Sequence, residues 1–252
     1  MENEINTILV SQPKPENNKS PFFALEAKHN IKVDFRSFIH IEGVDLKGFR
    51  DQRLNLPDFT AIILTSRKAV DNFFRICKES KYNVPDTLKY FCISEAVALY
   101  LQKHVVYRKR KIFHGRQKFI ELMELIKKHK SETFLLPSSD ILKDVIPNSL
   151  DEAGINYKRT ILYKTVISDL SDLENVTYDC LVFYSPAGIE SLFKNFPDFK
   201  QNSTRIAVFG STTISTVKNN GLRVDIAAPN KKAPSMSMAL DQYITEANKR
   251  RR

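Results

Sequence analysis

The chain has 252 residues, of which 42% are apolar, and it carries a formal net charge of +10. This length allows one or two packed domains. The sequence has no run near the roughly 18 consecutive apolar residues of a membrane span, and its N-terminus lacks the pattern of a signal peptide. We therefore expect a cytoplasmic protein. The positive charge favours an anionic partner, but charge alone does not distinguish nucleic acid, lipid and a polyanionic small molecule.

Cysteine and histidine spacing indicates no metal site. Cys77, Cys92 and Cys180 lie far apart in apolar contexts without a CxxC pair, so we expect small core residues rather than disulfides. The five histidines show neither HExxH nor a zinc-like spacing. The chain also lacks a GxxxxGK(S/T) phosphate loop, a GxGxxG dinucleotide turn and a GxSxG nucleophile elbow. The sequence therefore predicts neither a metal nor a cofactor.

From the N-terminus, short apolar strands alternate with helices. Thr7–Val10 is predicted to form a strand, and Ser20 followed by Pro21 is typical of a helix start with a serine cap. Ile31–Val44 alternates apolar and polar residues, which favours an extended segment. A buried strand, a small polar turn and a helix then follow at Ala61–Val70.

The same succession of elements recurs later in the chain, which indicates an internal duplication. Ala61–Val70 is repeated by Cys180–Ile189, and Tyr90–Ala98 is repeated by Arg205–Thr213. The remaining elements of the two copies are expected strands at Val105–Tyr107 and Arg223–Ile226, and expected helices at Gln117–Lys128 and Ser235–Ala247. Strands that alternate with helices predict parallel sheets covered by helices on both faces, so we expect two copies of one α/β unit.

Two alternating segments connect the copies, Ile31–Val44 on the way in and Tyr157–Ile167 on the way out. Such a pair suggests a two-stranded linker between two domains that can hinge. The expected division is a discontinuous domain of residues 1–37 and 167–252, a second domain of residues 45–157, and a linker of residues 38–44 and 158–166.

Small hydroxyl residues follow nearly every predicted strand and open the next helix. In open parallel sheets, ligands bind beyond the carboxyl ends of the strands, which makes these turns the candidate site. They are Ser11–Pro13, Thr65–Arg67, Ile93–Glu95, Pro137–Ser139, Ser185–Gly188 and Gly210–Thr213. Each serine or threonine can simply cap its helix, but converging helix N-termini also bind carboxylates or phosphates. An enzyme with such a site would work by binding and orienting its substrate.

Two basic clusters leave a nucleic-acid alternative open. Tyr107–Lys111 and Lys249–Arg252 are rich in lysine and arginine, and we expect solvated surface at both. The chain carries no zinc finger and no RNA-binding aromatic motif, so we expect no nucleic-acid partner.

Across nearly its whole length the chain resembles the uroporphyrinogen-III synthases. The stretches that carry the resemblance are ILVSQP (8–13), IILTSRKAVDNFF (62–74), DEAGINYKRTILYKTV (151–166), LVFYSPAGIESLF (181–193) and IAVFGSTTISTVKNNGLRVDIAAP (206–229). The resemblance implies an α/β fold of two flavodoxin-like parallel-sheet domains joined by a two-stranded β linker. It also implies a cofactor-free enzyme of haem biosynthesis that cyclises hydroxymethylbilane, with inversion of the terminal pyrrole ring and loss of water. We expect it to act as a monomer, without nucleic acid or membrane.

The resemblance also assigns roles to residues. Tyr163 matches the linker tyrosine of the family and would assist departure of the hydroxyl group, although an aromatic packed at a hinge is an equal alternative. The expected substrate-binding residues are Thr65, Ser66, Arg67, Ser185, Pro186, Ala187, Gly188, Arg205, Ser211 and Thr212.

Some positions depart from the family. Gln12, Ser138 and Ser139 stand where the family often has arginine or an Arg-Gly turn. Fewer arginines mean fewer charge-assisted contacts with a polycarboxylate. The alternative function is therefore a non-catalytic protein of the same fold that binds a tetrapyrrole or another polyanion.

Overall fold

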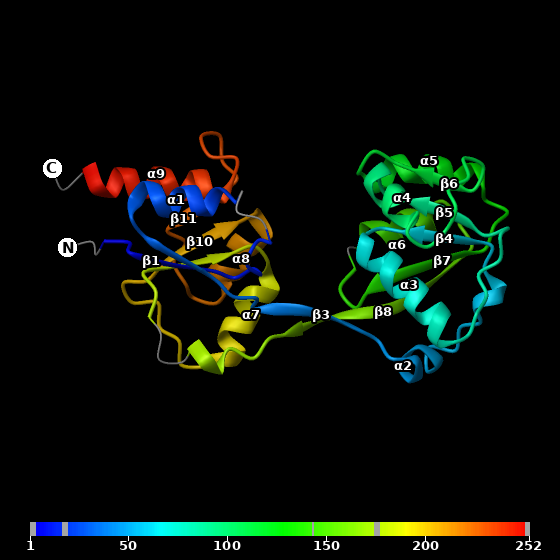
Figure 1. Ribbon diagram of the computed structural model, residues 1–252, viewed down its shortest axis with the longest axis horizontal. Helices are drawn as coiled ribbons and strands as arrows, with labels where there is room; N and C mark the ends of the chain where they lie inside the picture. Colours follow the sequence, from blue (N-terminus) through cyan, green and yellow to red (C-terminus); the bar gives the residue numbers. More distant parts are fainter. Residues whose placement is uncertain (1–3, 17–19, 143, 174–176, 250–252) are drawn as a thin grey trace. The chain divides into compact units, whose positions relative to one another are not determined.

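The computed structural model describes residues 4–16, 20–142, 144–173 and 177–249. The chain divides into two compact units (Figure 1). Unit 1 combines the residues up to His40 with those from Val166 onward, and unit 2 is the continuous segment Ile41–Thr165. Arg250, Arg251 and Arg252, which end the basic C-terminal cluster, lie outside the described residues.

Unit 1 contains a five-stranded parallel sheet in the order β11-β10-β9-β1-β2. Its strands are β1 (Thr7–Val10), β2 (Lys32–Phe35), β9 (Cys180–Phe183), β10 (Arg205–Phe209) and β11 (Ile226–Ala228). Numbered in chain order, this is the 2-1-3-4-5 arrangement of flavodoxin-like sheets.

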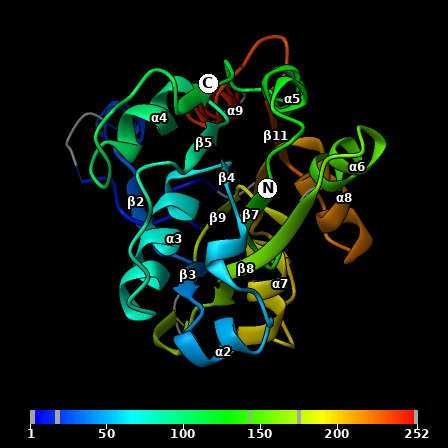
Figure 2. The same ribbon diagram turned by 90° about the vertical axis from the view of Figure 1, so that its right-hand side faces the viewer.

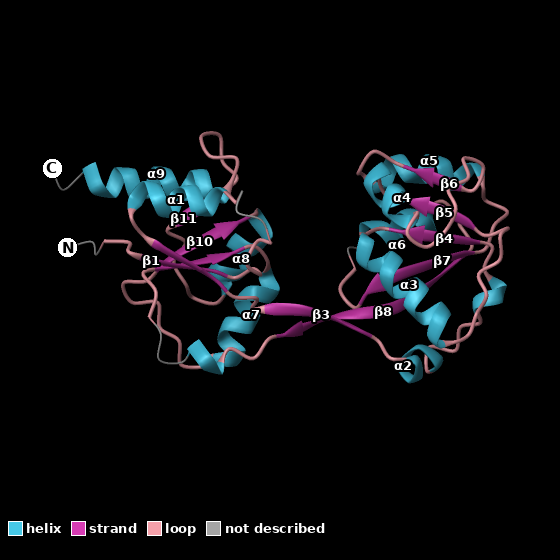
Figure 3. Cartoon of the chain, viewed as in Figure 1, coloured by secondary structure: helices cyan, strands magenta, loops and turns pink. Residues whose placement is uncertain are grey.

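Helices cover both faces of this sheet (Figure 3). One face packs against α1 (Pro21–His29) and α9 (Met236–Lys249), and the other against α7 (Pro186–Asn195) and α8 (Ser211–Asn219). A short 3-10 helix, η2, spans Ser171–Leu173. The start of α1 agrees with the sequence prediction, because the Ser20 side chain accepts a hydrogen bond from the Phe22 amide and Pro21 is the first helical residue.

Unit 2 is built on a six-stranded sheet in the order β3-β8-β7-β4-β5-β6. The strands are β3 (Ile39–Gly43), β4 (Ala61–Leu64), β5 (Lys89–Cys92), β6 (Ile112–His114), β7 (Phe134–Ser139) and β8 (Tyr157–Ile167). Strands β4 to β8 pair in parallel. β3 lies beside β8 (Figure 3) and is antiparallel to it, because Val44 donates to Leu162 while Ser168 donates to Phe38.

The helices of unit 2 also form two layers, which Figure 2 shows on opposite sides of the sheet. α3 (Arg67–Glu79) and α4 (Glu95–Leu101) cover one face, and α5 (Phe119–Lys128) and α6 (Val145–Glu152) cover the other. The short α2 (Leu46–Arg50) and the 3-10 helix η1 (Leu56–Asp58) follow β3. Cys77 and Cys92 are buried in this unit and Cys180 in unit 1, which confirms that the cysteines are core residues.

The two sheets share one strand order but not one chain order. The succession β6-β5-β4-β7-β8 in unit 2 repeats β11-β10-β9-β1-β2 in unit 1. In unit 2, however, the strands that correspond to β1 and β2 come last, as β7 and β8, with α6 between them. The units are thus circular permutations of each other. For this reason the duplication visible in the sequence covers only three strands of each sheet.

Two expected strands are misplaced in the sequence analysis. Val105–Tyr107 is irregular, Val106 is 79% exposed, and the strand forms instead at β6, where Ile112 is buried. Arg108–Lys111 therefore precede a strand rather than ending one, and Arg108, Lys109 and Arg110 are exposed. β11 begins at Ile226, so the residues before it do not form the expected strand at Arg223–Ile226. In both cases the neighbouring strand can pair only with the segment whose apolar side chains reach the core.

Candidate active site

The strand order places one switch point in each sheet, where the chain reverses the direction in which strands are added. In unit 1 it lies between β1 and β9, and in unit 2 between β7 and β4. At the carboxyl ends of these strands lie Ser11 and Ser185 in unit 1, and Ser139, the last residue of β7, and Ser66 in unit 2. Crevices at switch points are the usual ligand sites of open parallel sheets, so both pairs of turns are candidate binding positions.

In unit 2 the structure brings two of the expected residues together. Ser66 caps α3, and its Oγ accepts a hydrogen bond from the Ala69 amide at 3.0 Å. The same Oγ lies 3.2 Å from the phenol oxygen of Tyr163, in hydrogen-bond contact. Tyr163 is only 6% exposed and packs in the core between the sheet and α3 and α4. A buried aromatic ring thus ends in a hydroxyl that meets the turn after β4.

A β-bulge gives Tyr163 its orientation. Ser138 pairs with Ile161 and Ser139 with Tyr163, so Leu162 is an extra residue opposite β7. Consecutive residues of a regular strand point to opposite faces, but Leu162 and Tyr163 both lie in the same core cluster. The bulge re-aims the strand and places the tyrosine on the face of α3.

Hydrogen bonds hold the backbone around Tyr163 on both sides. Its carbonyl accepts from the Asp140 amide at 3.1 Å. The carbonyl of Leu162 accepts from the Val44 amide at 2.8 Å and from an Nη2 of Arg75 at 3.3 Å. Arg75 also donates to the Val44 carbonyl at 2.6 Å, so α3 is tied to both strands that leave unit 2.

The side chain of Gln52 continues this support one residue earlier. Its Oε1 accepts from the Ile161 amide and its Nε2 donates to the Ile161 carbonyl, each at 2.8 Å. A primary amide in this orientation makes the pair of bonds that a neighbouring strand would make. Gln52 therefore serves as a strand partner for β8 where β3 has already turned away.

An arginine reaches the turn after β7, although the sequence analysis found none there. The exposed Arg159 of β8 donates from Nε to Ser138 Oγ at 2.9 Å, and from Nη2 to the carbonyls of Ser139 and Asp140 at 2.8 and 2.9 Å. A guanidinium thus lies at the position where Ser138 and Ser139 suggested a loss of charge. The sequence analysis missed Arg159, Gln52 and Arg75 because their partners lie far away along the chain.

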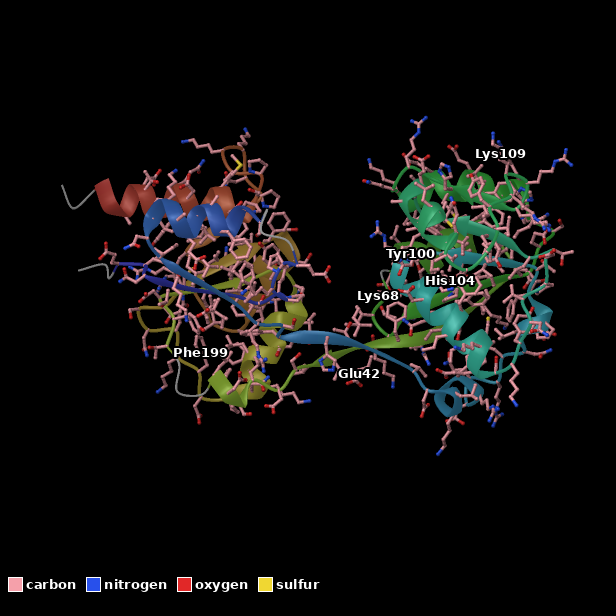
Figure 4. All side chains as sticks on the ribbon, viewed as in Figure 1. Glu42, Lys68, Tyr100, His104, Lys109 and Phe199 are labelled. Atoms are coloured by element: carbon pink, nitrogen blue, oxygen red, sulfur yellow. The ribbon has the colours of Figure 1, made fainter. Side chains whose placement is uncertain are left out.

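The first turn of α3 is positively charged. Arg67 and Lys68 are exposed and no acidic residue lies in this turn. The Arg67 guanidinium lies 5.4 Å from the centre of the Tyr100 ring, whose hydroxyl donates to Asp71 at 2.8 Å. Figure 4 labels Lys68 on α3 and Tyr100 on α4. Thr65, the remaining expected residue here, connects β4 to the Ser66 cap and is partly buried.

In unit 1, Ser185 caps α7 with Pro186 as the first helical residue. The Gly188 amide donates to Ser185, at 3.1 Å to the carbonyl and 3.3 Å to Oγ. A Cβ at Gly188 would lie 3.3 Å from the Phe183 ring, a tight contact, and 3.7 Å from Ser11 Oγ. The Gly188 amide is therefore occupied by Ser185. The Ala187 amide lies in the same first helical turn, where amides have no intrahelical acceptor.

The start of α8 differs from these serine-capped helices. Gly210 is its N-cap, with φ 88°, and no side chain caps the helix. Ser211 and Thr212 are exposed in the first turn. The amides of an uncapped helix start, together with the positive end of the helix dipole, bind carboxylates. Of the expected residues in unit 1, Ser211 and Thr212 are the most open to an anionic ligand.

Arg205 does not join these turns. It is the first residue of β10, at the amino end of the strand, and is 6% exposed. Its guanidinium donates to the Ser203 carbonyl at 3.3 Å. The structure therefore places it at the edge of the sheet opposite the candidate site.

Buried thiols and dispersed histidines offer no reactive cluster in the described part of the chain. Burial raises the pKa of the Cys77 and Cys92 thiols to about 12. Among the described residues, no three histidine, cysteine or acidic side chains are grouped to hold a metal ion. No helix that the structure describes has the length and apolarity that crossing a membrane requires.

Fold and site together define a protein of two parallel α/β units with flavodoxin-like strand order and hydroxyl-rich turns at the switch points. The profile of a family described as uroporphyrinogen-III synthase HemD matches residues 24–237. The chain therefore belongs to the uroporphyrinogen-III synthase family.

Individual relatives agree with this assignment. The uroporphyrinogen-III synthase of Chlorobaculum parvum is 24% identical over 95% of this chain and 100% of its own length. The synthase of Saccharomyces cerevisiae is 26% identical over 41% of this chain and 43% of its own. The crystal structure of uroporphyrinogen-III synthetase from Helicobacter pylori has a TM-score of 0.61 at 18% identity, covering 96% of this chain and 100% of that one. These similarities confirm the expected two-domain α/β fold.

Proposed function

We propose that this chain closes hydroxymethylbilane to uroporphyrinogen III, with Tyr163 as the group that helps the terminal hydroxyl to leave. As a member of its family, the chain is a cyclising lyase of haem biosynthesis. The reaction inverts the terminal pyrrole ring and releases water. The assignment of residues to its steps is our proposal.

The observation that carries the proposal is the contact between Tyr163 and Ser66 at the switch point of unit 2. The ring of Tyr163 is fixed by the core, and the backbone by the Asp140 amide on its carbonyl and the Val44 amide on the carbonyl of Leu162, so the phenol has little freedom to move. A fixed phenol can donate a proton to the departing oxygen in a site that excludes water. The resulting electrophilic azafulvene is attacked by the pyrrole at the far end of the bilane.

The acetate and propionate groups of the substrate need several anion-binding positions. We propose Thr65 and Arg67, at the start of α3, for some of them, while the Ser66 hydroxyl is occupied by Tyr163 and the Ala69 amide. We propose the starts of α7 and α8 for others, with Ser185, Pro186, Ala187, Gly188, Ser211 and Thr212. Ser211 and Thr212 support this assignment best, because their helix has no capping side chain. Arg205 is left out of the set, since it lies at the amino end of β10.

These steps need only binding, orientation and proton transfer, so we propose that the enzyme uses no cofactor. One chain supplies both hydroxyls of the Tyr163–Ser66 pair, and we propose a cytoplasmic monomer without a nucleic-acid partner.

An isomer assay tests the function directly. Hydroxymethylbilane is generated in place, the protein is added, and the oxidised uroporphyrins are separated into isomers I and III. Spontaneous closure produces isomer I, so isomer III that increases with protein concentration is the expected result. Isomer I alone, beside an active control synthase, would contradict the proposal and favour a protein that binds the tetrapyrrole without turnover.

A further inference from the structure

We propose that Ser66 is a positioning residue that acts through Tyr163: it donates its hydroxyl hydrogen to the phenol oxygen and thereby directs the Tyr163 hydrogen toward the leaving group. This inference rests on the proposed role of Tyr163. It assigns Ser66 a task different from holding a substrate carboxylate. The chain of donors is the Ala69 amide, the Ser66 hydroxyl, the Tyr163 hydroxyl and finally the departing oxygen.

The cap favours this direction of the hydrogen bond. Ser66 Oγ already accepts from the Ala69 amide at 3.0 Å, which polarises its own O–H and makes it a better donor. Tyr163 is its partner at 3.2 Å. When the phenol oxygen accepts this bond, the phenol hydrogen takes the other direction in the ring plane. Within the described part of the chain, no other residue is hydrogen-bonded to the Tyr163 hydroxyl, so this hydrogen is available to a substrate.

The surroundings of Ser66 support the same direction. α3 has 13 residues, and its N-terminus is the positive end of the helix dipole. Arg67 and Lys68 add two exposed positive charges in the first turn. Negative charge that grows on the Tyr163 oxygen as its hydrogen departs is therefore stabilised by Ser66 and by the helix.

The step balances without a further reactant. The carbon–oxygen bond of the hydroxymethyl group breaks, and the oxygen leaves as water with the proton of Tyr163. The pyrrole at the far end then forms a carbon–carbon bond to the azafulvene, and its inversion through a spiro intermediate breaks one carbon–carbon bond and forms another. As this pyrrole regains aromaticity, its formerly free α-carbon loses one proton, and this proton restores the phenol. Ser66 keeps its own hydrogen throughout and only stabilises the charge on its partner.

The serine cap of α1 does not share this arrangement among the described residues. Ser20 caps α1 by accepting from the Phe22 amide, as Ser66 accepts from Ala69. In the described ranges, however, Ser20 has no tyrosine partner. Ser20→Ala is therefore a matched control that removes a serine cap without touching the proposed chain of donors.

The test is a double-mutant cycle measured as formation of isomer III. Ser66→Ala is expected to lower kcat about tenfold with little change in KM. The reason is that the lost hydrogen bond stabilises mainly the transition state, in which negative charge develops on the phenol oxygen. Tyr163→Phe is expected to lower kcat about a hundredfold. The double variant should be no slower than Tyr163→Phe, since Ser66 acts only through the phenol.

Two further variants separate function from folding. Ser66→Thr retains a capping hydroxyl and should restore most of kcat, and Ser20→Ala should lose comparable stability with unchanged kcat. A Ser66→Ala variant with raised KM and an effect that adds to Tyr163→Phe would overturn the inference and make Ser66 a substrate ligand. Wild-type activity of Tyr163→Phe is a different outcome, because it would contradict the proposed function itself.

Discussion

Tyr163 combines two properties: a ring packed as a core residue and a hydroxyl that meets a polar turn. The ring is held by its place in the cluster under α3, and the hydroxyl contacts Ser66 at 3.2 Å. The packed ring contributes to stability, whereas the hydroxyl is the proposed catalytic group. A substitution that removes only the oxygen can therefore distinguish the packing role from the chemical one.

For Tyr163→Phe we expect a large loss of turnover and a small loss of stability. The phenylalanine ring fills the same space, and one partly buried hydrogen bond costs about 1 kcal/mol, or roughly 2–4 °C in Tm for a chain of this size. kcat should fall about a hundredfold. Thermal unfolding and isomer III formation measure the two effects. Tyr90→Phe, in the same cluster, is the control and should leave kcat unchanged. A Tm loss above about 10 °C would instead indicate a packing role.

At the scale of elements, β8 shows how a strand is supported where its neighbour ends. Gln52 pairs with Ile161 as a strand would, and Arg75 ties Leu162 and Val44 to α3. The Asp140 amide donates to the next carbonyl, that of Tyr163. Three consecutive residues of β8 are thus fixed by partners from three different segments. This support sets the position of the catalytic candidate more firmly than the strand pairing alone.

Gln52→Glu should weaken this support although it changes a single atom. A carboxylate still accepts from the Ile161 amide, but it cannot donate to the Ile161 and Gly48 carbonyls that the amide now contacts. We expect a loss of about 1–3 kcal/mol in the free energy of unfolding. Urea denaturation measures it against Gln242→Glu, where the side chain is exposed and makes one bond to the Lys232 carbonyl. Equal losses in the free energy of unfolding for the two substitutions would show that Gln52 contributes no more to stability than an exposed glutamine.

Helices α1 and α9 are joined by a charged contact that makes stability depend on pH. Asp241 accepts from Lys28 at 2.8 Å and contacts His29 at 2.6 Å. Hydrogen bonds from Lys28, and then from His29, hold the pKa of Asp241 below its ordinary value. A lowered carboxyl pKa contributes stability above the ordinary pKa near 4, and this contribution is lost as pH falls through the folded pKa.

Asp241→Asn should therefore destabilise the chain at pH 7 and matter less in acid. Because the pair is partly exposed, the expected loss is at most about 1 kcal/mol in the free energy of unfolding. The difference from wild type should narrow as the pH is lowered from 5 toward 3, as urea titrations at each pH would show. Glu246→Gln, exposed on the same helix, should show neither effect. A difference that widens in acid would contradict the assignment.

At the scale of the whole molecule, the two units share a sheet order but differ in how the chain enters it. Unit 1 is assembled from both ends of the chain, whereas unit 2 is one continuous segment with its own two core clusters. The circular permutation explains this difference, because the strands that unit 1 takes from the N-terminus are supplied in unit 2 by β7 and β8. We propose that unit 2 is an independent folding domain.

A fragment of residues 41–165 is therefore expected to unfold cooperatively on its own. It retains β4 to β7 and most of β8, including Leu162 and Tyr163. The shorter fragment 45–157 loses nearly all of β8 and exposes the edge of β7, so it should not fold. Circular dichroism during heating tests both. Two fragments that melt alike would show that β8 belongs to the linker and not to the core of unit 2.

How much of this protein could be predicted depends on the distance over which each feature acts. The alternation of strands and helices, the serine caps of α1, α3 and α7 and the burial of the cysteines involve neighbours within a few residues. The position of Arg205 could also have been predicted from the sequence. A residue that begins a strand lies at the edge of the sheet opposite the carboxyl ends of the strands.

The sequence by itself therefore determined the fold class and the turns at the carboxyl ends of the strands, because backbone hydrogen bonds and apolar periodicity are local. Only the tertiary structure brought Tyr163 to Ser66, 97 residues away, and Gln52 to Ile161, 109 residues away. Strict alternation along β8 would have separated Leu162 from Tyr163, and the bulge opposite β7 placed both in one core. Such contacts arise when sheets and helices pack, so no local pattern in the chain encodes them.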